Sequence, residues 1–519
     1  MSSPARTVIV SRMDRHDDPI SHPAPHPRRR RGRTHKAPAS AATSPWAPAA
    51  NRVLLTCSLA NWIAAFMTTS INIALPTIQT EFRLGAVALG WLPLVYVLAT
   101  AVFLLPFSKV ADIFGRRRLF VSGLALVFLS TLMMVFANSY AWLVLFRVTQ
   151  GIGGAMIFAT STAIVTLVYP PTRRGWAMGI LVMAAYLGQT LGPVLGGVIV
   201  HNVGWRSLFV FGAVYMFANL TLDLWLLRRA EWREGATSFD WRGALIYGPA
   251  LAAVLIGLSW LPTVQAIVLF CAGTVGIIAF LWWESRSPDP LIELGLFRHN
   301  RLFALSNLAA VISYVSVWGV TFLMSLYLQF VKGLSAQTAG FVLITGVALQ
   351  AGFSPVAGRL ADRVQARWLA SFGMGLCFLG LLGLSFLDAA SSYGLVIVAL
   401  CLLGLGYAFF SGPNQASIMG SVERRQVTVA GASLGTMRVI GQAMSIAIAT
   451  LILALVVGRQ DIRPADYPAL LTACRISFAI MTALCLLGTA VSLVRGPMPQ
   501  QRPPTTSEAA PPTGALPET

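Results

Sequence analysis

Long apolar runs separated by short polar connections make up most of the chain. From Val53 onward each run is about twenty residues long, which at about 1.5 Å per residue lets a helix cross a hydrocarbon core of about 30 Å. The pattern predicts an all-α polytopic membrane protein with fourteen transmembrane helices. Their expected spans are 53–78, 87–107, 119–137, 141–167, 176–200, 207–227, 243–260, 265–283, 303–330, 338–357, 368–387, 392–419, 431–457 and 473–494.

Composition supports the membrane assignment. Of the 519 residues, 56% are hydrophobic and 11% are charged, whereas soluble domains carry about a quarter charged residues. The six cysteines lie in or beside apolar runs without a CxxC pair, so neither a disulfide framework nor a metal site is expected. Walker A, HExxH and zinc-ligand spacings are absent, and GASLG at 431–435 follows no strand, so we expect no enzyme activity and no cofactor.

Two segments outside the runs differ in composition. Residues 1–50 are rich in Pro, Arg and His, residues 497–519 are rich in Pro, and neither segment has apolar periodicity. Both are expected to be disordered tails. The first tail is interpreted as a topology-setting segment, with adhesion to anionic lipid through Arg28–Arg31, or metal capture by its histidines, as the alternatives.

The formal net charge of +19 comes almost entirely from arginine. Such an excess can indicate nucleic-acid binding, but in membrane proteins it marks cytoplasmic loops. Alternate connections carry the clusters, so we expect no nucleic-acid partner and both termini in the cytoplasm of a plasma-membrane protein. The cationic positions assigned to that side are Lys109, Arg116–Arg118, Arg173, Arg174, Arg228, Arg229, Arg233, Arg242, Arg286, Arg298, Arg301, Arg359, Arg363, Arg367, Arg424 and Arg425.

An internal repeat predicts two halves. SKVADIFGRRR at 108–118 and GRLADRVQAR at 358–367 each follow a span on the cationic side. The repeat indicates one six-helix half at 51–230, two inserted helices with flanking loops at 231–300 and a second six-helix half at 301–496. Substrate sites in proteins of this kind lie near mid-membrane where the halves meet.

Within the repeated loop, a carboxylate can pair with a guanidinium or cap a helix end, and it then forms a latch that differs between conformations. An ordinary solvated loop is the alternative, and the second copy favours the latch. The residues expected in it are Asp112, Gly115, Arg116, Arg117, Asp362 and Arg363.

The stretch GILVMAAYLGQTLGPVLGG at 179–197 predicts a possible moving joint. Gly188, Gly192 and Gly196 recur every fourth residue and share one helix face, which permits close helix packing. Pro193 removes the helical partner of the carbonyl of Gln189, so a bend is expected there. A merely tightly packed membrane helix is the alternative.

One arginine falls inside a predicted span. Arg147 in the fourth span would be costly in lipid and is expected to face a cavity or a partner, with Gln150 one turn along. A functional role is favoured over snorkelling because the side chain would have to reach several residues to leave the core. For Arg438 in the thirteenth span both interpretations stay open.

Together these motifs resemble the major facilitator superfamily, in its fourteen-helix drug:proton antiporter branch, over about residues 53–494. The resemblance implies alternating-access export coupled to protons and links the fourth-helix arginine to proton transfer. SGPNQASIMGSV at 411–422 and GTMRVIGQA at 435–443 also resemble this branch. The other matching residues are Gly179, Gly188, Gly192, Pro193, Gly196 and Gly197 in the fifth helix, Asp112, Gly115, Arg116 and Arg117 in the loop, repeated at Gly358, Asp362, Arg363 and Arg367, and Arg147, Gln150, Gly151 and Gly154 in the fourth helix.

The chain departs from the branch at Met67, where an aspartate implicated in proton coupling is usual. Methionine carries no proton. Asp223 in the sixth span is a possible relay, although a partner for Arg228 or Arg229 is favoured. With few acids available, a cavity near Arg147 is expected to suit neutral or anionic molecules better than lipophilic cations.

By the geometry of the family, the cavity would be lined by the first, fourth, ninth and twelfth helices. The expected function is export of lipophilic drugs or small organic molecules by a monomer, with lipid and substrate as partners and a proton as the coupling ion. A facilitator or exporter of a specific metabolite without proton coupling is one alternative, and a non-transporting sensor is another. The cavity candidates are Asn61, Trp62, Phe66, Asn72, Asn307, Tyr314, Trp318, Tyr407, Asn414 and Gln415, each equally able to be helix–helix glue.

Overall fold

The computed structural model describes residues 47–170, 173–226, 239–361, 363–423 and 426–496. Fourteen helices within these residues are long and apolar enough to cross a membrane, which confirms the predicted fold class. In the same residues one isolated β-type bridge occurs, between Gly85 and Asp461. Of the two predicted tails, 1–46 and 497–519 lie outside the described residues, and the last residues of the first tail belong to the first helix.

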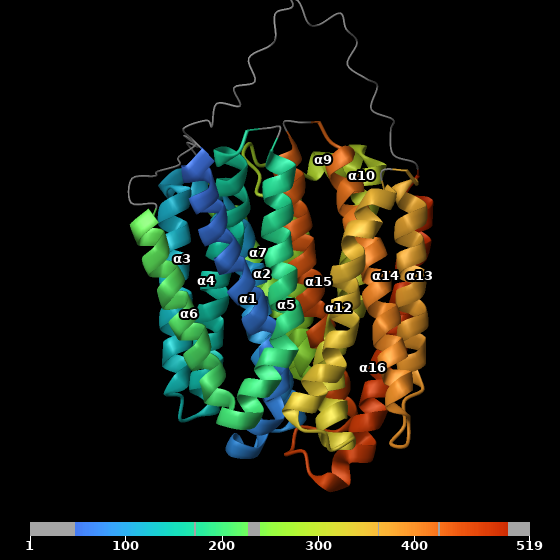
Figure 1. Ribbon diagram of the computed structural model, residues 1–519. Helices are drawn as coiled ribbons and strands as arrows, with labels where there is room; N and C mark the ends of the chain where they lie inside the picture. The colour runs from blue at the N-terminus through green and yellow to red at the C-terminus, as the bar shows by residue number, and fades with distance from the viewer. Residues whose placement is uncertain (1–46, 171–172, 227–238, 362, 424–425, 497–519) are drawn as a thin grey trace, which may run out of the picture. The chain divides into compact units, whose positions relative to one another are not determined.

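The long helices follow the predicted runs, and most of them begin a few residues earlier than predicted (Figure 1), whereas the short α9 corresponds to no predicted run. Their bounds are α1 Ala47–Phe82, α2 Ala86–Phe114, α3 Arg116–Val135, α4 Tyr140–Val168, α5 Arg174–Val203, α6 Trp205–Leu226, α7 Trp241–Trp260, α8 Val264–Glu284, α9 Leu294–His299, α10 Arg301–Val317, α11 Gly319–Leu326, α12 Ala336–Ala361, α13 Ala366–Ser385, α14 Tyr393–Gly420, α15 Val427–Val456 and α16 Tyr467–Val494.

The ninth predicted span is divided in the structure. It comprises α10, α11 and a π-helical turn at Tyr327–Val331. At the division the N–H of Gly319 donates to Ser445 Oγ on α15 over 2.8 Å, and a Cβ on Gly319 would lie 2.9 Å from that oxygen. A tertiary contact with α15 therefore replaces regular helical bonding at a position that hydrophobicity alone cannot identify.

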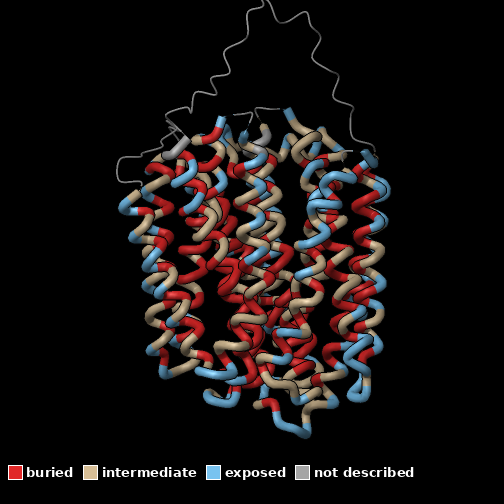
Figure 2. The backbone as a smooth tube through the Cα atoms, viewed as in Figure 1, coloured by how far each residue is buried: buried red, intermediate tan, exposed pale blue. Residues whose placement is uncertain are grey.

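Helices α1 to α6 pack on one another, and α10 to α16 form a second packed group. The groups meet where α2 packs on α15 and where α5 packs on α12. The inserted α7 packs on α8 and also on α2 and α15. In the most apolar stretches of α1 and α2, 78% of residues are buried, against 17% in α8, so α1 and α2 are interior helices and α8 is peripheral. Figure 2 shows buried positions on the faces that helices turn toward their neighbours.

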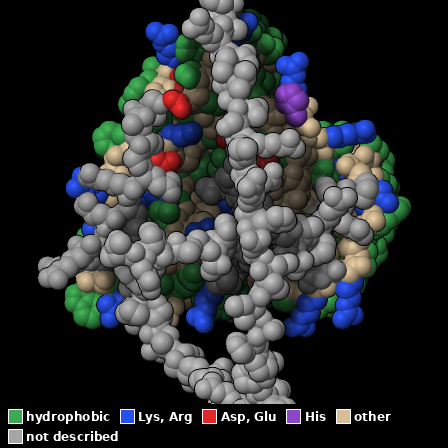
Figure 3. All heavy atoms as spheres, turned by 90° about the horizontal axis from the view of Figure 1, so that it is seen from above, with side chains coloured by type: hydrophobic (Ala, Val, Ile, Leu, Met, Phe, Trp, Pro, Cys, Tyr) green, Lys and Arg blue, Asp and Glu red, His purple; other side chains and the backbone are tan. Residues whose placement is uncertain are grey.

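The two ends of the bundle differ in charge. We call the end where α1 begins and α16 ends the basic end, because it carries Lys109, Arg116, Arg301 and Arg359. Seen from that side, Lys and Arg side chains lie around the rim (Figure 3). The other end, where α1 ends and α16 begins, is called the opposite end.

Candidate functional site

Helix α5 packs on α1 through the glycines of the stretch predicted to be a joint. A Cβ on Gly188 would overlap the carbonyl oxygen of Trp62, and a Cβ on Gly192 would overlap Thr69 Oγ1. By contrast, Gly179 lies nine residues before Gly188 and so on the opposite face of the helix, and a Cβ there would meet nothing within 4 Å. The glycine face therefore permits backbone contact between α5 and α1.

The helix is continuous through Pro193. Because proline has no N–H, the carbonyl of Gln189 lacks its helical donor, and Thr69 Oγ1 on α1 lies 3.3 Å from that carbonyl oxygen. One turn on, a Cβ on Gly196 would lie 2.8 Å from Ser70 Cβ. The carbonyl that Pro193 leaves without a helical donor thus accepts a hydrogen bond from a side chain of α1.

Helix α5 also contacts α12 in the other helix group. A Cβ on Gly197 would lie 2.6 Å from the carbonyl oxygen of Ala336, and a Cβ on Gly340 of α12 would overlap the carbonyl oxygen of Pro193. Helix α5 therefore packs through glycines both on α1 of its own group and on α12 of the other group.

The remaining face of α5 lines a cavity of about 340 Å³. Val182, Tyr186 and Gln189 lie on this face, and the lining reaches Lys109 at the basic end. A smaller cavity of about 90 Å³ continues to Asn72 on α1. The residues common to both linings are Gln189, Tyr314, Trp318 and Tyr407.

Most of the predicted cavity residues line these two spaces. They come from α1, α10, α14 and the residue that joins α10 to α11, and α5 and α15 contribute further walls. The predicted residues on the larger lining are Asn61, Tyr314, Trp318, Tyr407, Asn414 and Gln415, and Asn72 lies on the smaller one.

Trp62, Phe66 and Asn307 line neither cavity, contrary to expectation. Phe66 is fully buried with its ring centroid 5.4 Å from both Trp62 and Phe211, so these aromatic side chains pack between α1 and α6. Asn307 is buried and its Nδ2 donates to the carbonyl of Phe303 on its own helix. All three side chains therefore pack against helices. The apolar pattern of their helices does not determine which way such side chains point.

Arg147 is buried against a partner and lies outside both cavity linings, so the expected charge near the cavity is not this arginine. Its Nε donates to the carbonyl of Leu92 over 3.2 Å and Nη1 donates to Gln150 over 2.7 Å. The guanidinium lies 4.8 Å from the ring centre of Tyr96. Gln150 Nε2 in turn donates to Thr131 Oγ1 over 2.8 Å. Arg147 therefore joins α4, α2 and α3.

Met67 lies beside this network. A Cβ on Gly212 would lie 2.8 Å from Met67 Sδ and 3.1 Å from the methyl group of Thr131, which accepts from Gln150. Within the described residues, Nη2 of Arg147 has no hydrogen-bond partner. The position of the usual acid is thus close to a chain of polar groups that ends at a guanidinium with unused donor capacity.

Arg438 supplies the positive charge deep in the cavity. It is partly buried on the lining, with its guanidinium 5.9 Å from the ring centre of Phe158. A functional role and snorkelling were both open for this residue, and the structure places its side chain in the cavity wall. The other charged residues of the lining lie at the basic end and are Lys109, Asp112, Arg116 and Glu293.

The first copy of the predicted latch contains an ion pair. Asp112 Oδ1 accepts from Nε of Arg116 over 2.9 Å and from Nη2 over 2.8 Å. Gly115 has a φ of 103° and reverses the chain between α2 and α3. Arg117 Nε is buried without a hydrogen-bond partner among the described residues. In the second copy Asp362 lies outside the described residues, and Arg363 is exposed.

Asp223 lies in the packing of α6 and not on a cavity wall. Its side chain is fully buried, and neither carboxyl oxygen has a hydrogen-bond partner among the described residues. The partners expected for it, Arg228 and Arg229, lie outside the described residues. It belongs to neither of the two cavity linings.

Arg495 is a site residue that sequence reasoning missed. It follows α16 and is buried, with Nη1 donating to Asn414 Oδ1 and Nη2 to the carbonyl of Ala366, each over 2.6 Å. Burial lowers the pKa of Arg495 to about 10, which leaves it charged at neutral pH. Asn414 also donates to the carbonyl of Ser306 over 3.0 Å, so the cavity wall at Asn414 is braced from two sides.

Tyr186 and Gln189 were also missed, although a signal for them exists. Val182, Tyr186, Gln189 and Pro193 are spaced by four, three and four residues, which is the spacing of one helix face. That face is separate from the glycine face that packs on α1. A polar and aromatic stripe beside a glycine stripe could have identified both the cavity-lining face and the packing face of α5.

At the opposite end the two helix groups are joined. Ser325 Oγ on α11 donates to the carbonyl of Asn72 over 2.6 Å, and Gln329 Nε2 donates to the carbonyl of Ile73 over 3.2 Å. The β-type bridge described above joins the groups again beyond the end of α1. The larger cavity, by contrast, reaches charged residues at the basic end.

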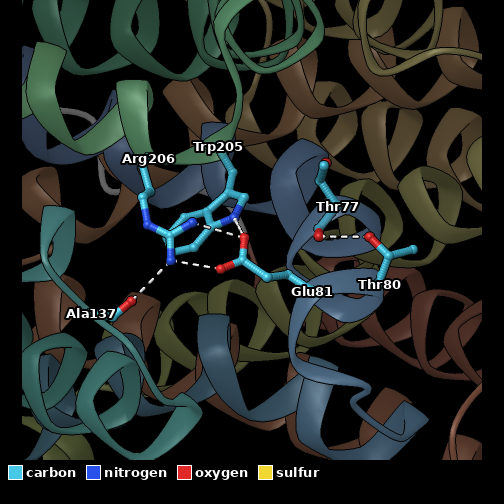
Figure 4. A network of polar contacts seen from close by, with 6 residues as sticks. All are labelled: Thr77, Thr80, Glu81, Ala137, Trp205 and Arg206. Carbon is cyan, nitrogen blue, oxygen red and sulfur yellow. Dashed lines mark hydrogen bonds and ion pairs between the residues drawn. The ribbon is translucent and has the colours of Figure 1, made fainter.

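A second polar network fixes the opposite end of the first group (Figure 4). Arg206 Nη2 pairs with Glu81 Oε1 over 2.6 Å and donates to the carbonyl of Ala137 over 3.1 Å. Trp205 Nε1 donates to Glu81 Oε2 over 2.7 Å. These contacts link α1, α6 and the α3–α4 connection, so they lie within the first group and do not join it to the second.

Comparison with known proteins agrees with this architecture. The family model described as Major Facilitator Superfamily matches residues 57–446 and 306–517. The multidrug resistance protein Stp of Mycobacterium tuberculosis is 33% identical over 419 residues, which cover 78% of this chain and 76% of that protein. The riboflavin transporter RibZ of Clostridioides difficile is 28% identical over 433 residues, covering 82% and 94%.

A solved structure supports the same fold. A bacterial homolog of the human lysosomal transporter Spinster, in an inward-facing and unoccupied conformation, superposes with a TM-score of 0.58 at 20% identity and covers 86% of this chain and 97% of its own. At that identity the likeness shows the fold alone. The family match, the identity to Stp and the fourteen spans together establish that the chain is a transporter of the major facilitator superfamily.

Proposed function

We propose that the protein exports lipophilic drugs or small organic molecules by alternating access. The observation that carries this proposal is that the two ends of the interface between the helix groups differ. The cavity reaches the basic end, whereas hydrogen bonds join the groups at the opposite end. Helix α5 belongs to the first group, packs on α1 through one set of glycines and contacts α12 of the second group through Gly197 and Gly340. Rocking of one group against the other would close the first end and open the second.

Orientation belongs to the same proposal. The basic end is assigned to the cytoplasm because arginine-rich connections stay on that side of the plasma membrane, and both termini follow it. Cysteines introduced at Arg359 and, separately, at Asp388 can be labelled with an impermeant maleimide in intact cells. Labelling at position 388 alone supports the assignment, and labelling at 359 alone reverses it.

For the driving force we propose proton antiport, supported by the fourth-helix motif and by the buried network around Arg147. The competing function is movement of a specific metabolite without proton coupling. Met67 favours that alternative, because no carboxylate occupies the usual position beside Thr131. The names of the two relatives support one function each, because Stp is named a multidrug resistance protein and RibZ a riboflavin transporter.

The deciding experiment uses the full chain in liposomes with an imposed pH gradient. A panel of lipophilic compounds is loaded, efflux is recorded, and the gradient is then collapsed with nigericin. Efflux that falls on collapse supports antiport. Efflux that continues unchanged rejects proton coupling and leaves the uncoupled transporter, whereas absence of flux for every compound contradicts export altogether.

A further inference from the structure

The middle of the cavity has a layer of aromatic side chains around one guanidinium. Phe158 on α4 lies ten residues from the basic end of its helix, Arg438 on α15 eleven and Tyr186 on α5 twelve. Tyr314 on α10 and Tyr407 on α14 lie thirteen residues from theirs. At 1.5 Å per residue, all five are roughly 15 to 20 Å from that end. All five line the larger cavity.

Within the described residues, no protein anion pairs with the guanidinium of this layer. Among the described residues Arg438 has no hydrogen bond or ion pair, and its contact is the ring of Phe158 at 5.9 Å. An isolated charge within a membrane helix is costly and faces a cavity or a partner. Arg438 faces the cavity, so the missing partner is one that enters it.

The acidic side chains of the lining lie outside this layer. Asp112 is near the end of α2 and is already paired with Arg116. Glu293 precedes α9, in the connection at the basic end. In the described part of the lining, the layer therefore contains one fixed positive charge and no fixed negative charge, and it disfavours a cation at the depth where aromatic rings would hold a planar molecule.

We propose that this layer binds planar aromatic anions, with Arg438 contacting the anionic group and Tyr186, Tyr314 and Tyr407 packing around the ring system. The inference rests on the proposed function in taking this cavity as the substrate path. A guanidinium forms two parallel hydrogen bonds with a carboxylate or a sulfonate, and ring stacking adds affinity without regard to charge. Arg438 is then the residue that selects substrates by charge.

Three probes that share one ring system test the proposal. Naphthalene-2-sulfonate is anionic, naphthalene-2-sulfonamide is neutral, and trimethyl(2-naphthyl)ammonium is cationic. Binding to the full chain in nanodiscs is measured by equilibrium dialysis with labelled probes. Wild type is expected to bind the sulfonate most tightly. Arg438→Gln should weaken sulfonate binding about tenfold or more, as expected for loss of a charged hydrogen bond, and should change sulfonamide binding less than threefold.

Two further variants keep the test decisive. Arg438→Lys retains the charge and should recover part of the sulfonate affinity, whereas Arg52→Gln, at an exposed arginine on α1, should change nothing. Equal loss of all three probes in Arg438→Gln, or wild-type preference for the cation, would overturn the proposal. Gradient-driven efflux of the cation without sulfonate binding overturns this inference and leaves export intact. Sulfonate binding without efflux of any compound supports this inference and contradicts export.

Discussion

Arg147 shows how one buried guanidinium can connect three helices. Its bonds reach the backbone of α2 at Leu92 and, through Gln150, the hydroxyl of Thr131 on α3. The charge could be located in a membrane span from the sequence. Its direction could not, because apolar residues lie on every side of α4 and hydrophobicity does not fix the rotation of such a helix.

Replacing Arg147 tests whether this network is needed for coupled transport. Arg147→Ala is expected to insert and fold but to lose gradient-driven efflux, because the side chain is removed from all three helices at once. Arg147→Lys, which keeps the charge but not the fork of donors, should retain part of the activity. Normal efflux in the alanine variant, measured in the liposome assay, would contradict the role.

Substitution of Met67 tests whether proton coupling can be strengthened at this position. Met67→Asp would place a carboxylate beside Thr131 and close to the network of Arg147, where it can be ionised or protonated. We expect efflux to respond more steeply to the imposed pH gradient in this variant. Met67→Asn is the matched control, because it is polar and of the same shape but does not titrate. Identical gradient dependence of both variants would show that this position does not carry the proton.

At the scale of elements, α5 has three distinct faces. One packs on α1 through Gly188, one touches α12 through Gly197, and one lines the cavity with Tyr186. The glycine face was predictable, since a four-residue spacing of small residues needs no structure to be recognised. The partner of each face was not, because spacing says which residues share a side but not which helix lies against it.

A pair of substitutions on α5 separates packing from helix propensity. Gly192→Ala should abolish efflux and lower stability by about 1 to 3 kcal/mol, the usual penalty for overpacking, because the added methyl group overlaps Thr69 Oγ1. Gly179→Ala adds the same group where nothing lies within 4 Å and should leave both properties unchanged. Thermal unfolding followed by tryptophan fluorescence, together with efflux, compares the two. Equal behaviour would argue against close packing as the function of the stripe.

At the scale of the whole molecule, the helix count followed from run lengths, and the family from motifs that survive in one sequence. The residues that join the groups at the opposite end did not follow from either. Ser325 and Gln329 donate to main-chain carbonyls of α1, and a contact with backbone leaves no pairing pattern in the sequence. Arg438 lay in a recognisable segment, but only the three-dimensional structure shows that no anionic side chain among the described residues pairs with it.

The contact of Ser325 with Asn72 predicts a measurable shift between conformations. Ser325→Ala removes the hydrogen bond to Asn72, worth about 1 kcal/mol, together with the bond that Ser325 Oγ accepts from Gln329, which should favour separation of the groups at the opposite end by about fivefold or more. Spin labels at the exposed positions Thr80 and Arg463 report the change as a longer distance in double electron–electron resonance. Ser316→Ala is the control, since that hydroxyl bonds only within its own helix at Ile312. Matching distance distributions for the two variants would rule out this contact as a gate.

Arg495 has a practical consequence for anyone who engineers the protein. Its guanidinium holds the cavity residue Asn414 and the first residue of α13 together, so the last charged residue before the C-terminal tail braces a residue of the cavity wall. Affinity tags or fluorescent fusions that replace residues from 497 onward leave that wall intact. A truncation only a few residues longer removes the brace, and an activity lost in such a variant reports on the cavity rather than on the tail.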